Sequence, residues 1–370
     1  MNWKTLDNID SSLYKGMAIL MIVTHNFMHL FPVPKENEFA FYPDRFFNLL
    51  HLVFNEPENI IRASLSFFGH FGVQIFVFLS AYGLAKKYSA HKLAYWPFIW
   101  QRILKIYPAF ILAILAWAII TGWFREWHGL LGPAKVLYWD IESIFLKLSL
   151  LSNFIPGQAL SPVGPWWFIP FIFQFYFIFP YLLYLYSKWG GSILLSISAM
   201  SIILSMAVQG EIGGLNIYFT ILGHLPEFCL GIYLARRDSD VLIRIPMLII
   251  LLAFVMYFLG NIYEIFWYVS HISFLIILLA IFGYIISTIK RNSPIRDVLL
   301  FFGAISMPLF LVNGFLRKPF ITWAIDYNYW LLTLALCLIS LLISIIVALA
   351  LSKIEKFLMS KVNSVSPISL

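Results

Sequence analysis

Charge is scarce in this chain of 370 residues, because Asp, Glu, Lys and Arg make up 12% of it and apolar residues 61%. A water-soluble domain carries about twice that share of charge, so we expect lipid to surround much of the molecule. Cysteine is scarce too. Cys229 and Cys337 both lie in apolar stretches without CxxC spacing, which argues against a disulfide framework and a cysteine zinc site.

The chain also lacks a long basic run, although its formal net charge is +7. Its basic residues sit in short clusters between apolar stretches, the pattern of cytoplasmic loops that face anionic lipid. We therefore expect no nucleic-acid partner. The first apolar stretch follows Lys15 and has no small-residue cleavage site after it, so it is expected to stay as a membrane helix.

Long apolar stretches dominate what remains. A helix needs about 20 mostly apolar residues to cross a bilayer core about 30 Å thick. Stretches of this kind predict an all-α, polytopic integral membrane protein of about ten transmembrane helices in one bundle. We expect a single domain over residues 1–370 and no soluble domain. The predicted spans are 13–31, 67–85, 103–122, 165–187, 190–208, 216–235, 245–261, 268–289, 298–316 and 329–352.

The basic residues predict the orientation of these spans. With a cytoplasmic N-terminus, seventeen Lys and Arg residues fall on the inside and eight on the outside, which fits the positive-inside rule. Both termini are then cytoplasmic, in a bacterial inner membrane, and segments 32–66 and 123–164 face outside. Within the second, the apolar run 144–151 is too short to cross; it either lies on the surface or re-enters the bundle.

Ionisable side chains inside a membrane usually face a partner or a cavity, and His25 is the first of them. A neutral imidazole can act as a general base toward a hydroxyl; the alternative is a hydrogen-bonded core histidine. His25 and His29 have the i, i+4 spacing of metal ligands, but Asn26 follows His25 where a metalloprotease helix has Glu. With no carboxylate cluster nearby in the sequence, we expect no metal, and His29 is interpreted as an interfacial histidine.

Two further groups of polar residues have alternative roles. Arg102 and Lys105 are spaced i, i+3 and share a helix face, either as ordinary membrane anchors or as a cationic mouth for a phosphorylated ligand such as coenzyme A. Glu227 is the one carboxylate well inside a predicted span. It pairs with His224 or a basic residue, serves as a proton site in a transporter, or orients a base in an enzyme.

Six stretches in this order resemble the acyltransferase-3 superfamily of membrane acyltransferases, from about residue 10 to 320. They are KGMAILMIVTH, FGVQIFVFLSAYGLAKKY, QRILKIYPAF, PWWFIPFIFQFYFIFP, LPEFCLGIYLA and AISMPLFLVNGFL. Members of this family resemble one another in a domain of ten or so helices that moves acyl groups onto cell-surface sugars. Each stretch alone is weakly specific, whereas six in the right order are a specific signal.

The resemblance implies roles for particular residues. His25 is then the catalytic base, Arg102 and Lys105 bind acyl-CoA (acetyl-CoA in the simplest case) as a co-substrate, and a glycan acceptor enters from the outer side. No bound cofactor is expected. The residues expected to position the substrate or stabilise the oxyanion are Trp167, Gln174, Tyr176, Glu227, Ser306 and Asn313.

The sequence departs from the family pattern at several positions. Lys15 precedes His25 by ten residues instead of eleven, which turns it off the face that His25 shares with Tyr14. Lys105 stands for an arginine, Ile172 for a glutamate and Asn313 for a histidine.

Two other functions stay open from the sequence. One is a transporter or flippase for a surface glycan or lipid-linked sugar, with His224 and Glu227 as a proton relay. The other is a non-catalytic membrane scaffold. The acceptor, the acyl chain and the oligomeric state are not determined by the residues.

Overall fold

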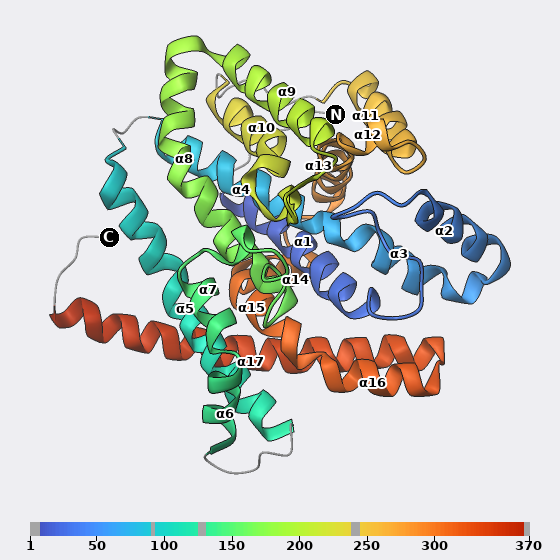
Figure 1. Ribbon diagram of the computed structural model, residues 1–370, viewed down its shortest axis with the longest axis vertical. Helices are drawn as coiled ribbons and strands as arrows, with labels where there is room; N and C mark the ends of the chain where they lie inside the picture. Colours follow the sequence, from blue (N-terminus) through green and yellow to red (C-terminus); the bar gives the residue numbers. More distant parts are fainter. Residues whose placement is uncertain (1–7, 90–92, 125–130, 238–244, 366–370) are drawn as a thin grey trace. The chain divides into compact units, whose positions relative to one another are not determined.

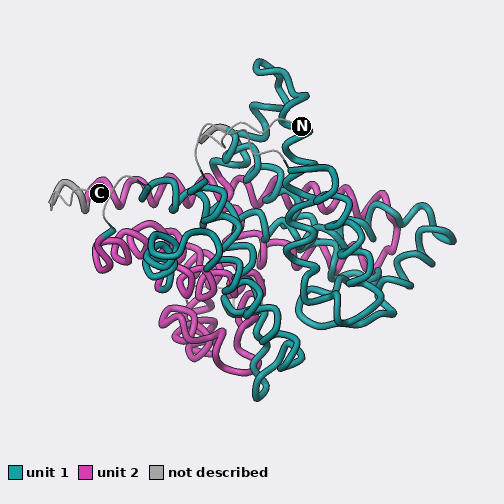
Figure 2. The backbone as a smooth tube through the Cα atoms, turned by 90° about the horizontal axis from the view of Figure 1, so that it is seen from above, with its two compact units in different colours: residues 1–93, 178–304 teal, residues 94–177, 305–370 magenta. Residues whose placement is uncertain are grey.

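The computed structural model describes residues 8–89, 93–124, 131–237 and 245–365, and helices make up most of them. The chain forms two compact units, shown in different colours in Figure 2. Unit 1 comprises residues 1–93 and 178–304, and unit 2 comprises residues 94–177 and 305–370. The expectation of an all-α, membrane-type protein is therefore confirmed.

Unit 1 holds most of the helices in Figure 1. Its α-helices are α1 (Asn8–Met28), α2 (Pro43–Asn55), α3 (Ile60–Phe68), α4 (Gly72–Lys87), α9 (Gly191–Ala207), α10 (Leu225–Arg236), α11 (Met247–Gly260), α12 (Glu264–Trp267), α13 (Ser270–Thr288) and α14 (Pro294–Ala304). Its short 3-10 helices and strands are η1 (Pro57–Asn59), η2 (Gly69–Phe71), β1 (Glu211–Ile212), β2 (Leu215–Asn216), η5 (Ile217–Phe219) and η6 (Ile221–His224).

Unit 2 holds the remaining elements, and helix α8 (Phe168–Trp189) runs from unit 2 into unit 1. The others are α5 (Tyr95–Phe124), α6 (Leu131–Trp139), α7 (Ile141–Leu148), η3 (Ser152–Phe154), η4 (Gly164–Trp167), α15 (Ser306–Leu316), α16 (Lys318–Tyr327) and α17 (Trp330–Val365).

Helix α1 is central to unit 1, where it packs against α14, α3 and α4 (Figure 1). Its contact with α14 depends on two glycines. A Cβ added to Gly16 would collide with the backbone oxygen of Leu299, and one added to Gly303 would collide with the backbone oxygen of Ser12. The two backbones therefore approach closely because neither helix has a side chain at the crossing.

Among the described residues, five helical stretches are long and apolar enough to cross a membrane, or six if one bent pair counts as a span. The five are Pro57–Lys87, Tyr95–Trp123, Gly164–Trp189, Ser270–Thr288 and Trp330–Lys361. The bent pair is α14 and α15, which meet at 75°. Pro308 lies in the first turn of α15 and cannot donate a hydrogen bond to the preceding turn, which explains the break.

Ten crossings are not confirmed, because some predicted spans are shorter or interrupted. Helices α9 and α11 have 17 and 14 residues. The predicted span 216–235 is not one helix: β1 and β2 form a hairpin, and α10 begins only at Leu225. Gly213 and Gly214 join the strands with φ angles of 57° and 83°, as a two-residue hairpin turn requires. Pro226 then favours a helix start.

One face of α5 shows how the surface meets lipid. Ile111, Leu115 and Ile119 recur every four residues and are 45–58% exposed. Phe110 and Trp117, on the other side of the same helix, are 0–2% exposed. An apolar stripe left open on a long helix is the pattern of a lipid-facing surface.

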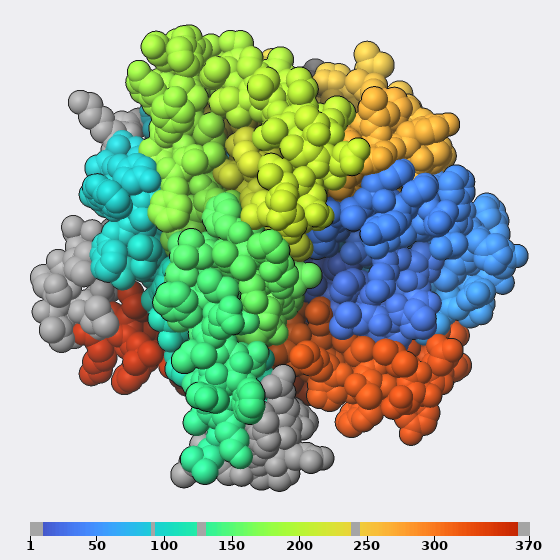
Figure 3. Space-filling view, viewed as in Figure 1, coloured from blue at the N-terminus to red at the C-terminus, as the bar shows by residue number. Residues whose placement is uncertain are grey.

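The segments predicted to lie outside the membrane are largely helical. In segment 32–66, Phe46 of α2 packs edge-on against Phe258 of α11, with ring centroids 5.5 Å apart; Figure 3 shows these two parts of unit 1 side by side. In segment 123–164, α7 has eight residues and is too short to cross a bilayer. The Tyr107 hydroxyl of α5 donates to the backbone oxygen of Leu148 at 2.6 Å, so the end of α7 is held against α5.

Candidate functional site

His25 lies near the end of α1 and is 4% exposed. Its Nδ1 is 2.8 Å from the backbone oxygen of Ser66 in α3. Because a carbonyl oxygen only accepts hydrogen bonds, this contact requires a proton on Nδ1. The Nε2 atom of neutral His25 therefore carries the lone pair, and the imidazole is held in the tautomer of a base.

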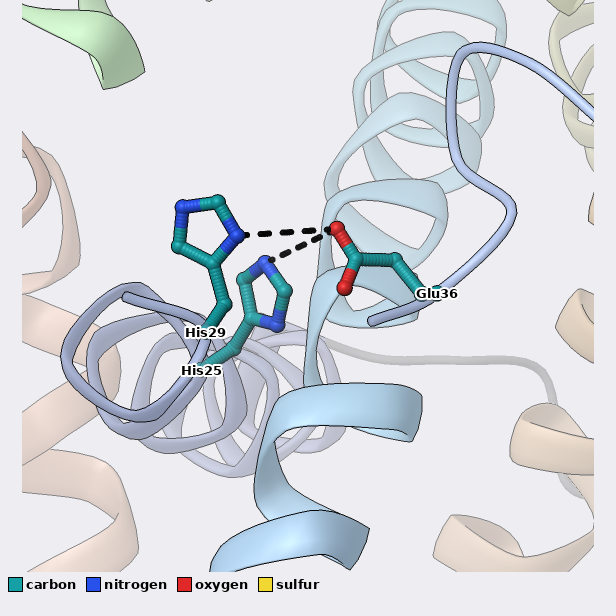
Figure 4. A group of neighbouring side chains, drawn as sticks. All are labelled: His25, His29 and Glu36. Atoms are coloured by element: carbon teal, nitrogen blue, oxygen red, sulfur yellow. Dashed lines mark ion pairs between the residues drawn. The ribbon is translucent and has the colours of Figure 1, made fainter. Parts of the chain in front are cut away.

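A carboxylate faces that lone pair. The Oε1 atom of Glu36 lies 3.8 Å from Nε2 of His25 and 3.8 Å from Nδ1 of His29, as Figure 4 shows. Two consecutive turns of α1 place the histidines on one face, with ring centroids 5.0 Å apart. His25 and Glu36 are both buried, whereas the His29 side chain is 32% exposed. The carboxylate of Glu36 is therefore within ion-pair distance of both imidazoles.

Backbone contacts after α1 fix the position of Glu36. Arg45 of α2 donates to the backbone oxygen of Glu36. The next residue, Asn37, accepts from the Trp267 indole at 2.7 Å through its backbone oxygen and from the Tyr42 amide at 3.0 Å through its side chain. These contacts hold an irregular segment in one place, so the carboxylate meets the histidines although no helix carries it.

The electrostatics of Glu36 favour a cation at its side. Burial raises the pKa of Glu36 above its ordinary value, and the nearby His29, Arg45 and Lys35 oppose that rise. Within the described part of the chain, its Oε2 atom has no hydrogen-bond partner. A buried carboxylate with an open oxygen is stabilised by a positive charge, and a protonated His25 would supply one.

Gly69 explains how His25 fits beneath α3. A Cβ added to this residue would lie 2.5 Å from the Cβ of His25 and 2.8 Å from the backbone oxygen of Met21. The next residue, His70, has its ring centroid 5.6 Å from that of His25. A cavity of about 10 Å³ touches both Glu36 and His70, which is room for about one water molecule.

A second cluster in unit 1 joins His224, Glu227 and His271. One ligand atom from each lies within 4.8 Å of the others, and all three residues are buried. Sequence reasoning considered His224 as a partner of Glu227 and did not connect His271 to them. Both this cluster and His25, His29 and Glu36 contain two imidazoles and one carboxylate, a donor set that can hold a metal ion.

In unit 2, Arg102 lies beside two aromatic rings that contact each other. Its guanidinium carbon is 5.5 Å from the ring centroid of Phe98 and 5.9 Å from that of Tyr176. Arg102 is 8% exposed, whereas Lys105 is exposed, although both lie on α5. The structure therefore brings Arg102 and Tyr176 together and gives the two cations different surroundings.

The other residues singled out from the sequence lie in the core of unit 2. Gln174, Trp167 and Ser306 are buried. The Asn313 side-chain amide donates to the backbone oxygens of Leu309 and Phe310 in its own helix, at 3.0 and 2.7 Å.

The neighbouring indole of Trp166, which sequence reasoning passed over, donates to the backbone oxygen of Leu311 at 2.8 Å. This bond connects η4 to α15. Trp166 is fully buried, so it is a structural residue that supports the segment carrying Trp167.

Sequence reasoning missed the partners of His25. The family pattern pointed to a basic residue, Lys15, as the partner of His25, and no carboxylate cluster was visible near His25 in the sequence. The structure places Glu36 there instead, and Tyr14 donates to the backbone oxygen of Leu279 at 3.2 Å. The available signal was a Glu only eleven residues after His25, but the path of an irregular segment cannot be inferred from spacing.

One comparison with known proteins is positive. A family model described as an acyltransferase domain matches residues 8–349. Among curated proteins and among solved structures, none matches the chain. The match includes both clusters of unit 1 and the Arg102 site of unit 2.

Proposed function

The chain belongs to the acyltransferase domain family, and from that premise we propose that it transfers an acyl group, most simply acetyl, from acyl-CoA to a hydroxyl. The acceptor is a cell-surface or periplasmic glycan. Family membership and the apolar helices support a membrane acyltransferase in general. They do not support a transporter or flippase.

The observation that carries the proposal is the tautomer of His25. With Nδ1 donating to Ser66, the Nε2 atom accepts the proton of the acceptor hydroxyl as its oxygen attacks the thioester carbon. The carbon–oxygen bond forms, and the tetrahedral oxyanion collapses with cleavage of the carbon–sulfur bond. The proton on His25 then passes to the departing thiolate, so the products are an ester and free coenzyme A.

Glu36 stabilises the cation that this step creates. Its Oε1 atom is 3.8 Å from the Nε2 atom of His25, too long for a hydrogen bond but close enough for a strong charge interaction in a buried site. Ser66 fixes the ring from the other side. The two groups are positioning residues, because each acts on the reaction through His25.

Arg102 is the proposed contact for the phosphates of acyl-CoA. A guanidinium forms forked hydrogen bonds to phosphate, and its Nε atom has no hydrogen-bond partner within the described residues. The guanidinium packs beside the rings of Phe98 and Tyr176, which restricts its motion and lowers the entropy lost on binding. Lys105 is exposed and would add a second positive charge.

The remaining candidates would position the acceptor or donate to the oxyanion. A donor held ready for a developing oxyanion contributes up to a few kcal/mol. Among them, the Tyr176 hydroxyl and the Gln174 amide have the required donor groups on a helix. The candidate residues are Trp167, Gln174, Tyr176, Glu227, Ser306 and Asn313.

The proposed cellular setting is a bacterial inner membrane. About ten crossings would require α1, α9, α10 and α11 to cross in addition to the five or six longer apolar stretches. Cytoplasmic termini follow from the distribution of Lys and Arg. In this topology acyl-CoA arrives from the cytoplasm and the glycan from the outer side. Reporter fusions at the C-terminus and in segment 32–66 should respond from opposite sides of the membrane; a response from the same side contradicts the topology.

Replacement of His25 by Gln tests the function. Gln fills the site and can hydrogen-bond, but it cannot take up a proton at neutral pH. We expect glycan acylation, measured by mass spectrometry of surface glycans from cells with the wild-type or variant gene, to fall at least 100-fold. His51, which is exposed on α2, offers the control His51→Gln, which should retain acylation. Undiminished acylation in His25→Gln at equal membrane abundance would reject the base assignment.

A further inference from the structure

The second histidine cluster is separate from the group of His25, His29 and Glu36, and neither of its imidazoles takes part in the proposed reaction. His224 ends η6, Glu227 is in the first turn of α10 and His271 is in the first turn of α13. The three residues are 1–3% exposed. Three separate elements therefore bring two imidazoles and a carboxylate to one buried point.

The hydrogen bonds around this point fix which atoms face it. The Nε2 atom of His224 is 3.1 Å from the backbone oxygen of Tyr218. Since that oxygen only accepts, Nε2 carries the proton and Nδ1 carries the lone pair. A metal-binding histidine is usually held in this way, with its other nitrogen donating to a carbonyl or carboxylate. His224 is thus oriented like a ligand before any ion binds.

Each of the other two residues has a buried polar atom without a hydrogen-bond partner among the described residues. Within the described part of the chain, Oε2 of Glu227 and Nε2 of His271 make no hydrogen bond. Buried polar atoms without a partner are rare in folded proteins and point to a missing ligand, ion or proton. A metal ion would bind the carboxylate of Glu227 in its deprotonated form.

We propose that His224, Glu227 and His271 bind one divalent transition-metal ion, with Zn²⁺ as the best-matched probe. Two imidazoles and a carboxylate with an open fourth position are a zinc donor set. Around a tetrahedral ion with bonds of about 2.0–2.1 Å, the donors lie about 3.4 Å apart. The donor atoms lie within 4.8 Å of one another, so they would have to move closer by up to about 1.4 Å to reach this separation.

The location suggests what the ion does. The ring of His271 is 6.4 Å from that of His70, which is 5.6 Å from that of His25. The ion would hold η6, α10 and α13 together through one ligand from each. It would thereby stabilise the packing next to His70, the neighbour of His25. The site neither depends on the acyl transfer reaction nor uses the lone pair of His25.

The group of His25, His29 and Glu36 is a weaker metal site, although its donors are the same in kind. His29 is 32% exposed at its side chain, and both imidazoles already pair with the single carboxylate. All three residues of the second cluster are buried, and within the described residues the Nε2 atom of His271 has no hydrogen-bond partner. These features favour it as the place where an ion would bind.

Metal analysis of the purified full chain tests the proposal. The protein in detergent is stripped with a chelator, dialysed against micromolar Zn²⁺ and measured by mass spectrometry for metal per chain. We expect one Zn²⁺, with X-ray absorption showing nitrogen and oxygen ligands at about 2.0–2.1 Å. Less than 0.2 Zn²⁺ per chain, or a shell of sulfur ligands, would overturn the site.

Variants locate the ion. Glu227→Gln and His271→Gln keep the size of the site and should weaken Zn²⁺ binding at least 10-fold in competition with a chromophoric chelator, whereas His51→Gln should leave binding unchanged. His29→Gln should also bind normally, and a loss there would assign the ion to the other cluster and overturn the proposal. Unaltered Zn²⁺ binding in both Glu227→Gln and His271→Gln would also overturn the proposal. If the cluster variants do not purify as monodisperse protein, the wild-type stoichiometry and absorption spectrum decide.

Discussion

Replacement of Glu36 by Gln isolates the carboxylate from the rest of the site. At 3.8 Å from His25 and an effective dielectric constant of about 20, a full charge pair is worth about 4 kcal/mol. If about half of the imidazolium charge has developed in the transition state, the loss is about 2 kcal/mol, or about 30-fold in kcat. Without the carboxylate the imidazole is protonated less readily, so the acid limb of the pH–rate profile should move to lower pH.

The assay is the release of coenzyme A thiol from saturating acetyl-CoA by the purified protein, with surface glycan from the host cells as acceptor. Glu58→Gln, an exposed carboxylate in the same outer segment, is the matched control and should keep the wild-type rate and profile. A loss of less than about threefold in Glu36→Gln, with its acid limb in the wild-type position, would refute the stabilising role of the carboxylate.

Three further substitutions test other parts of the structure. Arg102→Ala should raise the KM for acetyl-CoA by roughly 10- to 100-fold through loss of charge-assisted hydrogen bonds. Lys105→Ala, which removes an exposed cation, should raise it by less. Equal KM values for Arg102→Ala and the wild type would mean that Arg102 only anchors the helix in the membrane. Burial lowers the pKa of Lys147 from 10.5 to about 7, so neutral Lys is favoured in the folded state and its burial costs most below pH 7. Lys147→Met also removes the hydrogen bond from Nζ to the backbone oxygen of Ala159, so it should stabilise by up to about 3 kcal/mol at pH 6. The gain should shrink as pH rises from 7 toward 10.5, and thermal melts with equal gains at pH 6 and 9 contradict this. Gly69→Ala should displace the catalytic imidazole and lower both the melting temperature and the rate, whereas Gly83→Ala, whose added Cβ meets nothing within 4 Å, should preserve both; a fully active Gly69→Ala would show that the close approach is dispensable.

Hydropathy and length were sufficient to predict the all-α membrane class, because lipid exposure requires long apolar helices and leaves few alternatives. The same information failed where local chemistry competes with hydropathy. The stretch 216–235 is apolar enough to be predicted as a span, but the short 3-10 helices η5 and η6 occupy its first half and α10 begins only at Leu225, next to Pro226. The break between α14 and α15 likewise follows from Pro308, which average hydropathy does not register.

The candidate site was also predictable only in part from the sequence. His25 could be singled out because an imidazole within an apolar helix is costly unless it has a task. Arg102 and Lys105 share a spacing that suggests equal roles, yet packing buries Arg102 beside two aromatic rings and leaves Lys105 exposed. Helical periodicity indicates the direction of a side chain, whereas its burial depends on neighbours from distant parts of the chain.

By itself, the sequence determined that this is a membrane-type protein, that it is helical and which family it belongs to. These properties depend on composition and on motifs that are local in the chain. Only the tertiary structure decided which polar groups meet. Glu36 reaches His25 through an irregular segment, Ser66 approaches from α3, and His271 joins His224 from 47 residues away. Such encounters depend on how helices and loops pack, since a shift of a few ångströms makes or abolishes a contact and leaves no trace in local sequence.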